Sequence, residues 1–272
     1  MKLGICNEIF KDWNDWQRTC DYVADVGYNG IEIAPFTFAN DVNEITAEKR
    51  AEIRRIAEED KLEIIGLHWL LVGPQGVHLT TADAAVRART AQYMVDLVNC
   101  CGDLGGTRMI FGSPKQRNLE EGMPYCKAFD HVREVFEKVL PALEVHGVTL
   151  CMEQLSPAET DFCSTVAKTV ELIDAIGHPN FQLILDTKAM AQEPLPRPDT
   201  IRQYAKYLRH YHANDENLKG PGFGRVNFAP IIQALKDINF KDYVSIEVFD
   251  FDMGPTGIAG RSFEYLTQFL SK

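Results

Sequence analysis

The chain has 272 residues, of which 45% are hydrophobic and 25% are charged. This is the composition of a globular protein, so it argues against wholesale disorder and against a collagen-like or coiled-coil fibre. Asp and Glu number 39 against 28 for Lys and Arg, which gives a net charge of -11. Because nucleic-acid affinity depends on Lys and Arg neutralising phosphates, we expect no nucleic-acid partner and no anionic membrane partner.

The seven cysteines form no CxxC pair and none of the usual zinc-finger spacings. We interpret them as reduced thiols, because Cys6 and Cys151 lie in apolar runs where a free cysteine packs as a small buried residue. The N-terminal segment becomes polar too soon for a signal peptide, and no apolar run approaches the roughly 18 residues of a membrane span. We therefore expect a cytoplasmic protein.

Short apolar runs alternate with longer amphipathic segments along the whole chain. The runs are apolar throughout, which is typical of strands covered on both faces, and they predict strands at residues 2–6, 30–34, 62–68, 107–112, 148–153, 182–186, 208–213 and 243–248. Apolar residues at intervals of three and four predict helices at 13–27, 46–59, 81–104, 119–146, 164–175, 198–206, 229–237 and 258–270. Pro124 should precede the regular part of the fourth helix, and Pro141 should kink it.

This alternation of strand and helix predicts a parallel sheet with right-handed crossovers. The 272 residues divided among eight strand–helix units give 34 residues for each unit, with nothing left over. A doubly wound open sheet is the alternative, but the even units and the lack of a Gly-rich first turn favour a closed (β/α)8 TIM barrel. No Pro- or Ser-rich linker divides the chain, so we expect one domain over residues 1–272.

Four consecutive predicted strands end in side chains that bind metals, namely Glu153, Asp186, His212 and Glu247. In a TIM barrel the chemistry lies at the carboxyl ends of the strands, so these side chains should meet at the mouth. Oxygen and nitrogen donors without thiolate suit Mn²⁺, Mg²⁺, Co²⁺ or Zn²⁺. Three carboxylates close together would repel one another without a cation, so the pattern predicts a divalent metal site, with Mn²⁺ as the expected ion.

Other side chains near the predicted strand ends are candidates for binding the substrate. His68 and Trp69 end the third strand and could supply a hydrogen bond and a stacking face for a sugar. Glu32 lies in the second strand, in the run GIEIAP, and could contact the substrate or orient a neighbouring group. His210 lies two residues before His212 on the same face of its strand, and we interpret it as a residue behind the ligands rather than a fifth ligand.

Three cations follow predicted strands and could hold a carboxylate or phosphate of the substrate. Lys115 and Arg117 lie in the segment after the fourth strand, and Lys188 follows Asp186 by two residues. The alternative for each is a charge on a solvated loop.

Several motifs together make the chain resemble the xylose isomerase-like TIM-barrel family, which includes ketose 3-epimerases, hydroxypyruvate isomerase and endonuclease IV. The resemblance covers essentially the whole chain, and the motifs are GYNGIEI at 27–33, MEQ at 152–154, LDT at 185–187, HYHAND at 210–215, GPGFGRVNF at 220–228 and YVSIEVFDF at 243–251. It implies that Glu153, Asp186, His212 and Glu247 are the metal ligands. It also implies that Glu153 and Glu247 are the catalytic acid and base.

Two positions depart from the epimerase pattern that this resemblance brings. Epimerases place a histidine three residues after the aspartate ligand, where this chain has Ala189. They place an arginine six residues after the histidine ligand, where this chain has Leu218. We therefore keep a lyase or dehydratase as an alternative to the epimerase.

The expected function is a divalent-metal-dependent isomerase or epimerase of a keto sugar or sugar derivative, with glutamate-mediated proton transfer through a metal-stabilised enediolate. The enzymatic alternative is a metal-dependent lyase or dehydratase of a keto-inositol, keto-sugar or related acid. The non-enzymatic alternative is a sugar-binding barrel module. The net charge argues against an endonuclease IV-like role. The expected partners are a small carbohydrate and further copies of the chain, as a homodimer or homotetramer.

Overall fold

The computed structural model describes residues 1–270, in which eight parallel strands form a closed barrel with consecutive strands as neighbours. β8 pairs with β1, which closes the ring. The strands are β1 (Lys2–Cys6), β2 (Gly30–Ile33), β3 (Glu63–Leu67), β4 (Arg108–Phe111), β5 (Thr149–Glu153), β6 (Phe181–Asp186), β7 (Leu208–Ala213) and β8 (Tyr243–Ile246). Each lies within two residues of its predicted bounds, so the predicted (β/α)8 barrel is confirmed.

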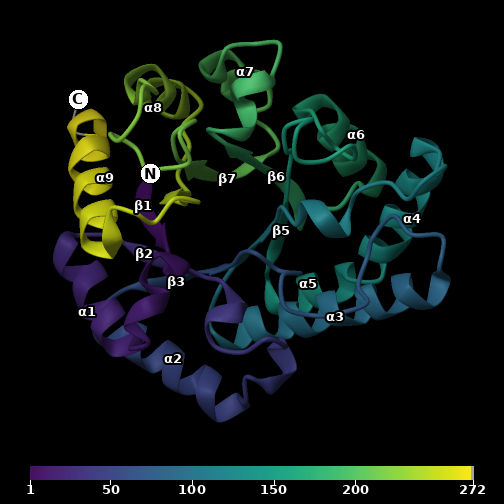
Figure 1. The fold of residues 1–272 in the computed structure, drawn as a ribbon, viewed down its shortest axis with the longest axis horizontal. Helices are drawn as coiled ribbons and strands as arrows, with labels where there is room; N and C mark the ends of the chain where they lie inside the picture. Colours follow the sequence, from purple (N-terminus) through teal and green to yellow (C-terminus); the bar gives the residue numbers. More distant parts are fainter. Residues whose placement is uncertain (271–272) are drawn as a thin grey trace.

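The helices lie outside the strands and cover the barrel (Figure 1). The α-helices are α1 (Trp16–Val26), α2 (Ala47–Glu59), α3 (Ala84–Asp103), α4 (Tyr125–Glu137), α5 (Leu140–His146), α6 (Val166–Ile176), α7 (Arg197–Gln203), α8 (Phe228–Asp237) and α9 (Gly254–Leu270). Short 3-10 helices are η1 (Asn7–Trp13), η2 (Pro35–Thr37), η3 (Val42–Glu44), η4 (Pro114–Gln116) and η5 (Ala189–Gln192). No helix within residues 1–270 combines the length and apolarity that a membrane crossing requires.

The predicted helix 119–146 was wrong in its extent and its continuity. Pro124 caps the start of α4, as expected, so the helix begins only at Tyr125. Pro141 lies in the first turn of α5, and α4 has already ended at Glu137. Residue 137 is the position whose carbonyl a proline at 141 would clash with inside a continuous helix, so the chain starts a new helix instead of bending one.

Parallel pairing sets the ends of neighbouring strands at one edge of the barrel. Asp186 of β6 is in register with His212 of β7, and Glu153 of β5 is in register with Ile184 of β6. The strands are buried on both faces, because side chains fill the barrel interior and the helices cover its outside. The fold therefore places the polar residues at the carboxyl ends of the strands together at one rim of the barrel.

Candidate metal and active site

The four predicted metal ligands come together at the carboxyl ends of β5 to β8. Glu153 ends β5, Asp186 ends β6, His212 lies in β7, and Glu247 directly follows β8. Each offers one ligand atom, and these atoms all lie within 4.8 Å of one another. All four side chains are buried. The set can hold a metal ion, because three carboxylates and an imidazole are the donors that divalent cations such as Mn²⁺ accept.

The carboxylates of this cluster repel one another. Burial, followed by the charges of Glu247 and Asp186, raises the pKa of Glu153 well above its usual range. Burial and Glu247 likewise raise the pKa of Asp186 to about 6. Burial opposes the ionisation of Glu247, but His212 outweighs it and lowers the pKa of Glu247. A bound dication would offset the excess negative charge, so the electrostatics of the cluster also fit a metal.

His212 is oriented by a buried carboxylate. Its Nδ1 lies 3.1 Å from Oε2 of Glu247, and its Nε2 lies 3.2 Å from Oε2 of Glu32. The other oxygen of Glu32 lies 2.6 Å from Nε2 of His210. A carboxylate behind a metal-binding histidine fixes the ring and its tautomer. These contacts are those of an orienting residue, and Glu32, predicted to bind substrate, has both oxygens engaged by histidines.

Asp186 is held in place by two donors. The backbone N–H of Ala189 donates to Oδ1 over 2.7 Å, and Nδ2 of Asn214 donates to Oδ2 over 2.5 Å. The side-chain oxygen Oδ1 of Asn214 in turn accepts a hydrogen bond from the backbone N–H of Lys188. Such hydrogen bonds preset the direction in which a ligand carboxylate points.

Trp69 and His68 lie against Glu247. The indole Nε1 of Trp69 donates to Oε1 of Glu247 over 2.9 Å, and Nδ1 of His68 lies 3.6 Å from the same oxygen. Trp69 has a φ of 53°, a left-handed conformation that costs a non-glycine residue roughly 1–3 kcal/mol. Its ring stacks on Phe249 with centroids 6.3 Å apart and packs near Phe36 at 5.7 Å. This aromatic group supplies an apolar surface beside the four ligands.

The three predicted cations have separate surroundings. Arg117 is completely buried and donates from Nη1 to the backbone carbonyl of Glu153 over 2.7 Å, so it supports the strand end that carries Glu153. Lys188 forms an ion pair with Glu159 over 2.5 Å and lies over the ring of Phe249. Lys115 lies exposed in η4. The predicted grouping of these cations around one anion therefore gains no support from their contacts in the described chain.

Glu8 is a buried residue of this region that the sequence analysis missed. It lies in η1, directly after β1, and its Oε2 is 2.9 Å from Nε2 of His68. The signal was present, because β1 also runs from apolar residues into polar ones at its carboxyl end. A polar side chain at the carboxyl end of the first strand predicts a mouth residue by the same rule as in the other strands, and this rule points to Glu8.

Comparison with known proteins identifies the family of this chain. The model of the xylose isomerase-like TIM barrel family matches residues 20–269. The chain belongs to this family. It is 28% identical to a D-psicose 3-epimerase of Agrobacterium fabrum over 256 residues, which is 92% of this chain and 85% of the relative. It is 26% identical to a D-psicose 3-epimerase of Ruminiclostridium cellulolyticum over 260 residues, 92% of this chain and 84% of the relative.

A solved structure shares the fold over almost the whole chain. A crystal structure of D-psicose 3-epimerase in the presence of D-fructose superposes with a TM-score of 0.83, at 23% identity, and covers 98% of each chain. At this level of identity the superposition shows the barrel fold. The resemblance predicted from the motifs is thus confirmed for the family.

Proposed function

We propose that this protein is a divalent-metal-dependent epimerase or isomerase of a keto sugar or sugar derivative. The observation that carries the proposal is the buried cluster of Glu153, Asp186, His212 and Glu247, with all four ligand atoms within 4.8 Å. It combines a metal-type donor set with two glutamates that can move protons. The curated relatives named D-psicose 3-epimerase support the same class of reaction.

The metal is proposed to be Mn²⁺, held by the four residues of the cluster. When bound, the ion would supply Lewis-acid stabilisation for negative charge that develops on the oxygens of the sugar. Mg²⁺, Co²⁺ and Zn²⁺ accept the same donors and are the alternatives.

Proton transfer is assigned to Glu153 and Glu247. The first ends β5 and the second follows β8, with β6 and β7 between them in the ring. The two carboxylates therefore approach a bound sugar from different sides. One glutamate would remove the proton from the carbon next to the carbonyl, and the other would return a proton to the opposite face. Return to the neighbouring carbon would give isomerisation instead.

The surroundings of the cluster support a sugar as the substrate. The rings of Trp69 and Phe249 stack beside Glu247 and offer an apolar face of the kind that sugars pack against. Lys188 lies over the ring of Phe249 and is proposed to contact substrate hydroxyl or acidic groups. His68, whose ring nitrogens face Glu8 and Glu247, is proposed to act through Glu247. Arg117, Lys115 and Glu32 are proposed to act on the substrate only indirectly.

A panel assay tests the function. The purified protein is incubated with Mn²⁺ and a set of ketoses, keto-glycosides and sugar acids, and the products are separated by chromatography. We expect an epimer or isomer of at least one compound, and no product with Asp186→Asn, which lacks a ligand charge. If no member of the panel is converted with any of the four metals, the proposal is wrong.

A metal-dependent lyase or dehydratase is the second candidate. It is favoured by Ala189, which is buried where epimerases carry a histidine, and by Leu218, which is exposed where they carry an arginine. The first proton abstraction would be the same, but a hydroxyl on the next carbon would then leave. Mass spectrometry of the products separates the two candidates, because only the lyase product has lost water. A homodimer or homotetramer and a cytoplasmic location remain predictions.

A further inference from the structure

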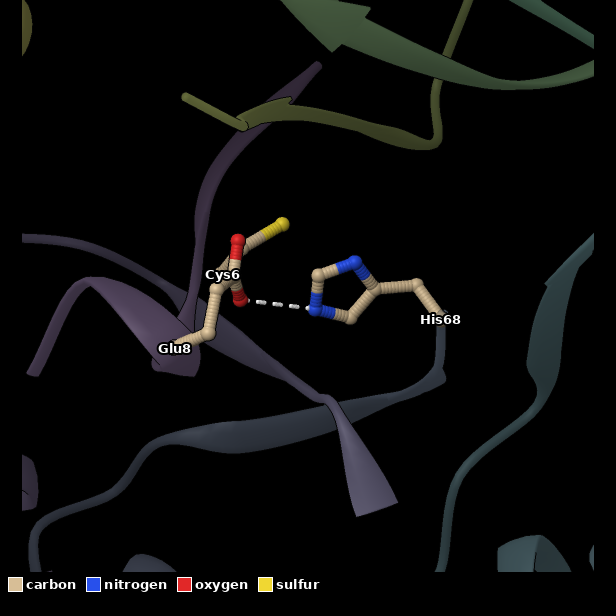
Figure 2. A group of neighbouring side chains, drawn as sticks. All are labelled: Cys6, Glu8 and His68. Carbon is tan, nitrogen blue, oxygen red and sulfur yellow. Dashed lines mark ion pairs between the residues drawn. The ribbon is translucent and has the colours of Figure 1, made fainter. Parts of the chain in front are cut away.

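A second cluster of metal-type side chains lies beside the first, on the opposite side of Glu247. It consists of Cys6 at the end of β1, Glu8 in η1 and His68 directly after β3. Figure 2 shows the three side chains directed toward one another, with Cys6 and Glu8 approaching from one segment and His68 from the other. All three are buried, with exposed fractions of 0%, 1% and 1%.

The donor atoms of this cluster are close enough to share one ion. The thiol sulfur, a carboxylate oxygen and an imidazole nitrogen all lie within 4.8 Å of one another. Around a tetrahedral Zn²⁺, donors of these types stand roughly 3.3–3.6 Å apart, as follows from their bond lengths to zinc. Small side-chain adjustments would therefore bring the three donors to coordination distance. The thiol distinguishes this set from the Glu153 cluster, which has no sulfur donor, and it favours a softer ion.

Glu8 and His68 face each other as a buried ion pair that has no hydrogen bond among the described residues. Their facing atoms are 2.9 Å apart, yet the pair lacks the alignment of a hydrogen bond, and both Glu8 oxygens and both His68 ring nitrogens have no hydrogen-bond partner among the described residues. A buried carboxylate whose oxygens accept no hydrogen bond is costly, and an ion pair offsets that cost fully only when hydrogen bonds satisfy its remaining polar atoms. A cation placed among these atoms would satisfy the oxygens of Glu8 and Nε2 of His68 together.

Cys6 also lies near Glu32 and His212, which is the other grouping it could join. In that grouping the oxygens of Glu32 already contact His210 and His212, at 2.6 and 3.2 Å. Those residues are therefore engaged in orienting His212. Glu8 and His68 form no ion pair with His212 among the described residues, so Cys6 is grouped with them.

We propose that Cys6, Glu8 and His68 form a second divalent-metal site, selective for Zn²⁺, with three protein ligands and one open position. In this arrangement Nε2 of His68 faces the ion, and its Nδ1 faces Oε1 of Glu247 at 3.6 Å. A metal-binding histidine whose other nitrogen faces a carboxylate is a common pairing. The thiolate and the carboxylate together balance the charge of the dication. The open position is available to water or to an oxygen of the substrate. The site does not depend on the proposed epimerase activity.

Cobalt spectroscopy tests this site without any substrate. The metal-free full-length protein is titrated with Co²⁺, and absorption is recorded in the near ultraviolet, where a thiolate bound to cobalt gives a charge-transfer band. We expect two equivalents to bind, with the band growing in with one of them. Bound zinc, counted by elemental analysis after incubation with Zn²⁺, should likewise reach two per chain.

Single substitutions show which residues bind each of the two equivalents of Co²⁺. Cys6→Ser should lose the band and one equivalent, whereas Cys151→Ser, which alters another fully buried strand cysteine, should keep both. Glu8→Gln should weaken the equivalent that carries the band, and Asp186→Asn should weaken only the one without it. Circular dichroism shows whether each variant is folded.

The wild-type spectrum tests the second metal site even if a variant fails to fold. One equivalent of metal without a charge-transfer band would overturn the second site and leave Glu8 and His68 as a pair that positions Glu247. A band that persists in folded Cys6→Ser protein would overturn it as well. Either result leaves the function proposed for the Glu153 cluster standing, because that function is tested by Asp186→Asn.

Discussion

Trp69 donates a 2.9 Å hydrogen bond from its indole Nε1 to Oε1 of Glu247, across a barrel in which the two residues are 178 positions apart in sequence. The bond fixes one oxygen of Glu247 while His212 contacts the other. A glutamate that is held at both oxygens keeps its place when a sugar binds. This positioning is what a carboxylate needs if it is both a metal ligand and a proton carrier.

Trp69→Phe should lower the turnover number strongly and leave the protein folded. Phenylalanine keeps an aromatic ring but loses the N–H, so Glu247 loses a donor. Removing a partner of a metal ligand typically costs about 10–100-fold in activity or metal affinity, and we expect a loss in that range. Steady-state kinetics at saturating Mn²⁺ measure it. Trp16→Phe is the control, because its indole donates to the backbone carbonyl of Ile53, away from the site. Equal losses in both variants would contradict the positioning role.

Glu32→Gln should weaken metal binding. The amide retains the size of Glu32 but removes the negative charge that faces Nε2 of His212. We expect the metal dissociation constant to rise about 10–100-fold, as measured by calorimetric titration with Mn²⁺. Glu171→Gln, on the exposed side of α6, should bind metal like the wild type. Unchanged affinity in Glu32→Gln would show that His212 needs no orienting carboxylate.

Gly112→Ala should disturb the site while the barrel stays folded. A Cβ at this position would lie 2.5 Å from Oε2 of Glu153, closer than real Cβ contacts allow. Since the glutamate tip is the flexible partner, it would be displaced from its place among the ligands. We predict weaker Mn²⁺ binding and reduced activity with little change in the circular dichroism spectrum. Gly257→Ala, whose nearest contact would be Met253 at 3.7 Å, should behave like the wild type.

Metal affinity should fall as the pH falls. In the metal-free protein the pKa of Asp186 is raised to about 6 and that of Glu153 is raised well above its usual range, both chiefly by burial. Asp186 therefore holds a proton below about pH 6, Glu153 stays protonated to a higher pH than an ordinary glutamate, and a metal must displace these protons. Affinity thus increases with pH up to the point at which both are ionised. Titrations between pH 5 and 8 in buffers of different ionisation enthalpy should show proton release on binding. Affinity that is flat over this range would contradict the prediction.

Removing the metal should lower thermal stability. Without a cation, three buried carboxylates share a site within 4.8 Å of His212, and ligands that bind only the folded state raise its melting temperature. We expect chelation to lower the melting temperature and added Mn²⁺ to restore it. In Asp186→Asn the response to Mn²⁺ should be reduced. A melting temperature that changes neither with the chelator nor with added Mn²⁺ would argue against a structural effect of the ion.

Much of this architecture is predictable from the sequence because it rests on local periodicity. Apolar runs mark the strands, and Glu153, Asp186 and Glu247 mark where they end. Parallel strands in a closed ring must bring such ends together, so the cluster follows from the pattern. Pro141 shows the limit of this reasoning, because sequence alone does not say whether a proline bends a helix or separates two.

Contacts across the barrel are less accessible to such reasoning. The pairing of Glu8 with His68 depends on how far the side chains reach from β1 and β3, and the left-handed backbone of Trp69 depends on tertiary packing. Arg117 looks like a loop cation in sequence, yet it is completely buried against the carbonyl of Glu153. Whether a charged side chain is exposed to solvent or buried in the core becomes known only from the folded structure, which shows what surrounds it.

Exchange of carbon-bound hydrogen with deuterated buffer, followed by NMR, is the most direct measurement of the proposed chemistry. A substrate found in the panel is incubated with wild-type protein and Mn²⁺. We predict deuterium at the carbon next to the carbonyl, dependent on metal and strongly reduced in Glu153→Gln and in Glu247→Gln. Conversion of the sugar without any deuterium incorporation, or full incorporation in both glutamine variants, would contradict proton transfer by these two glutamates.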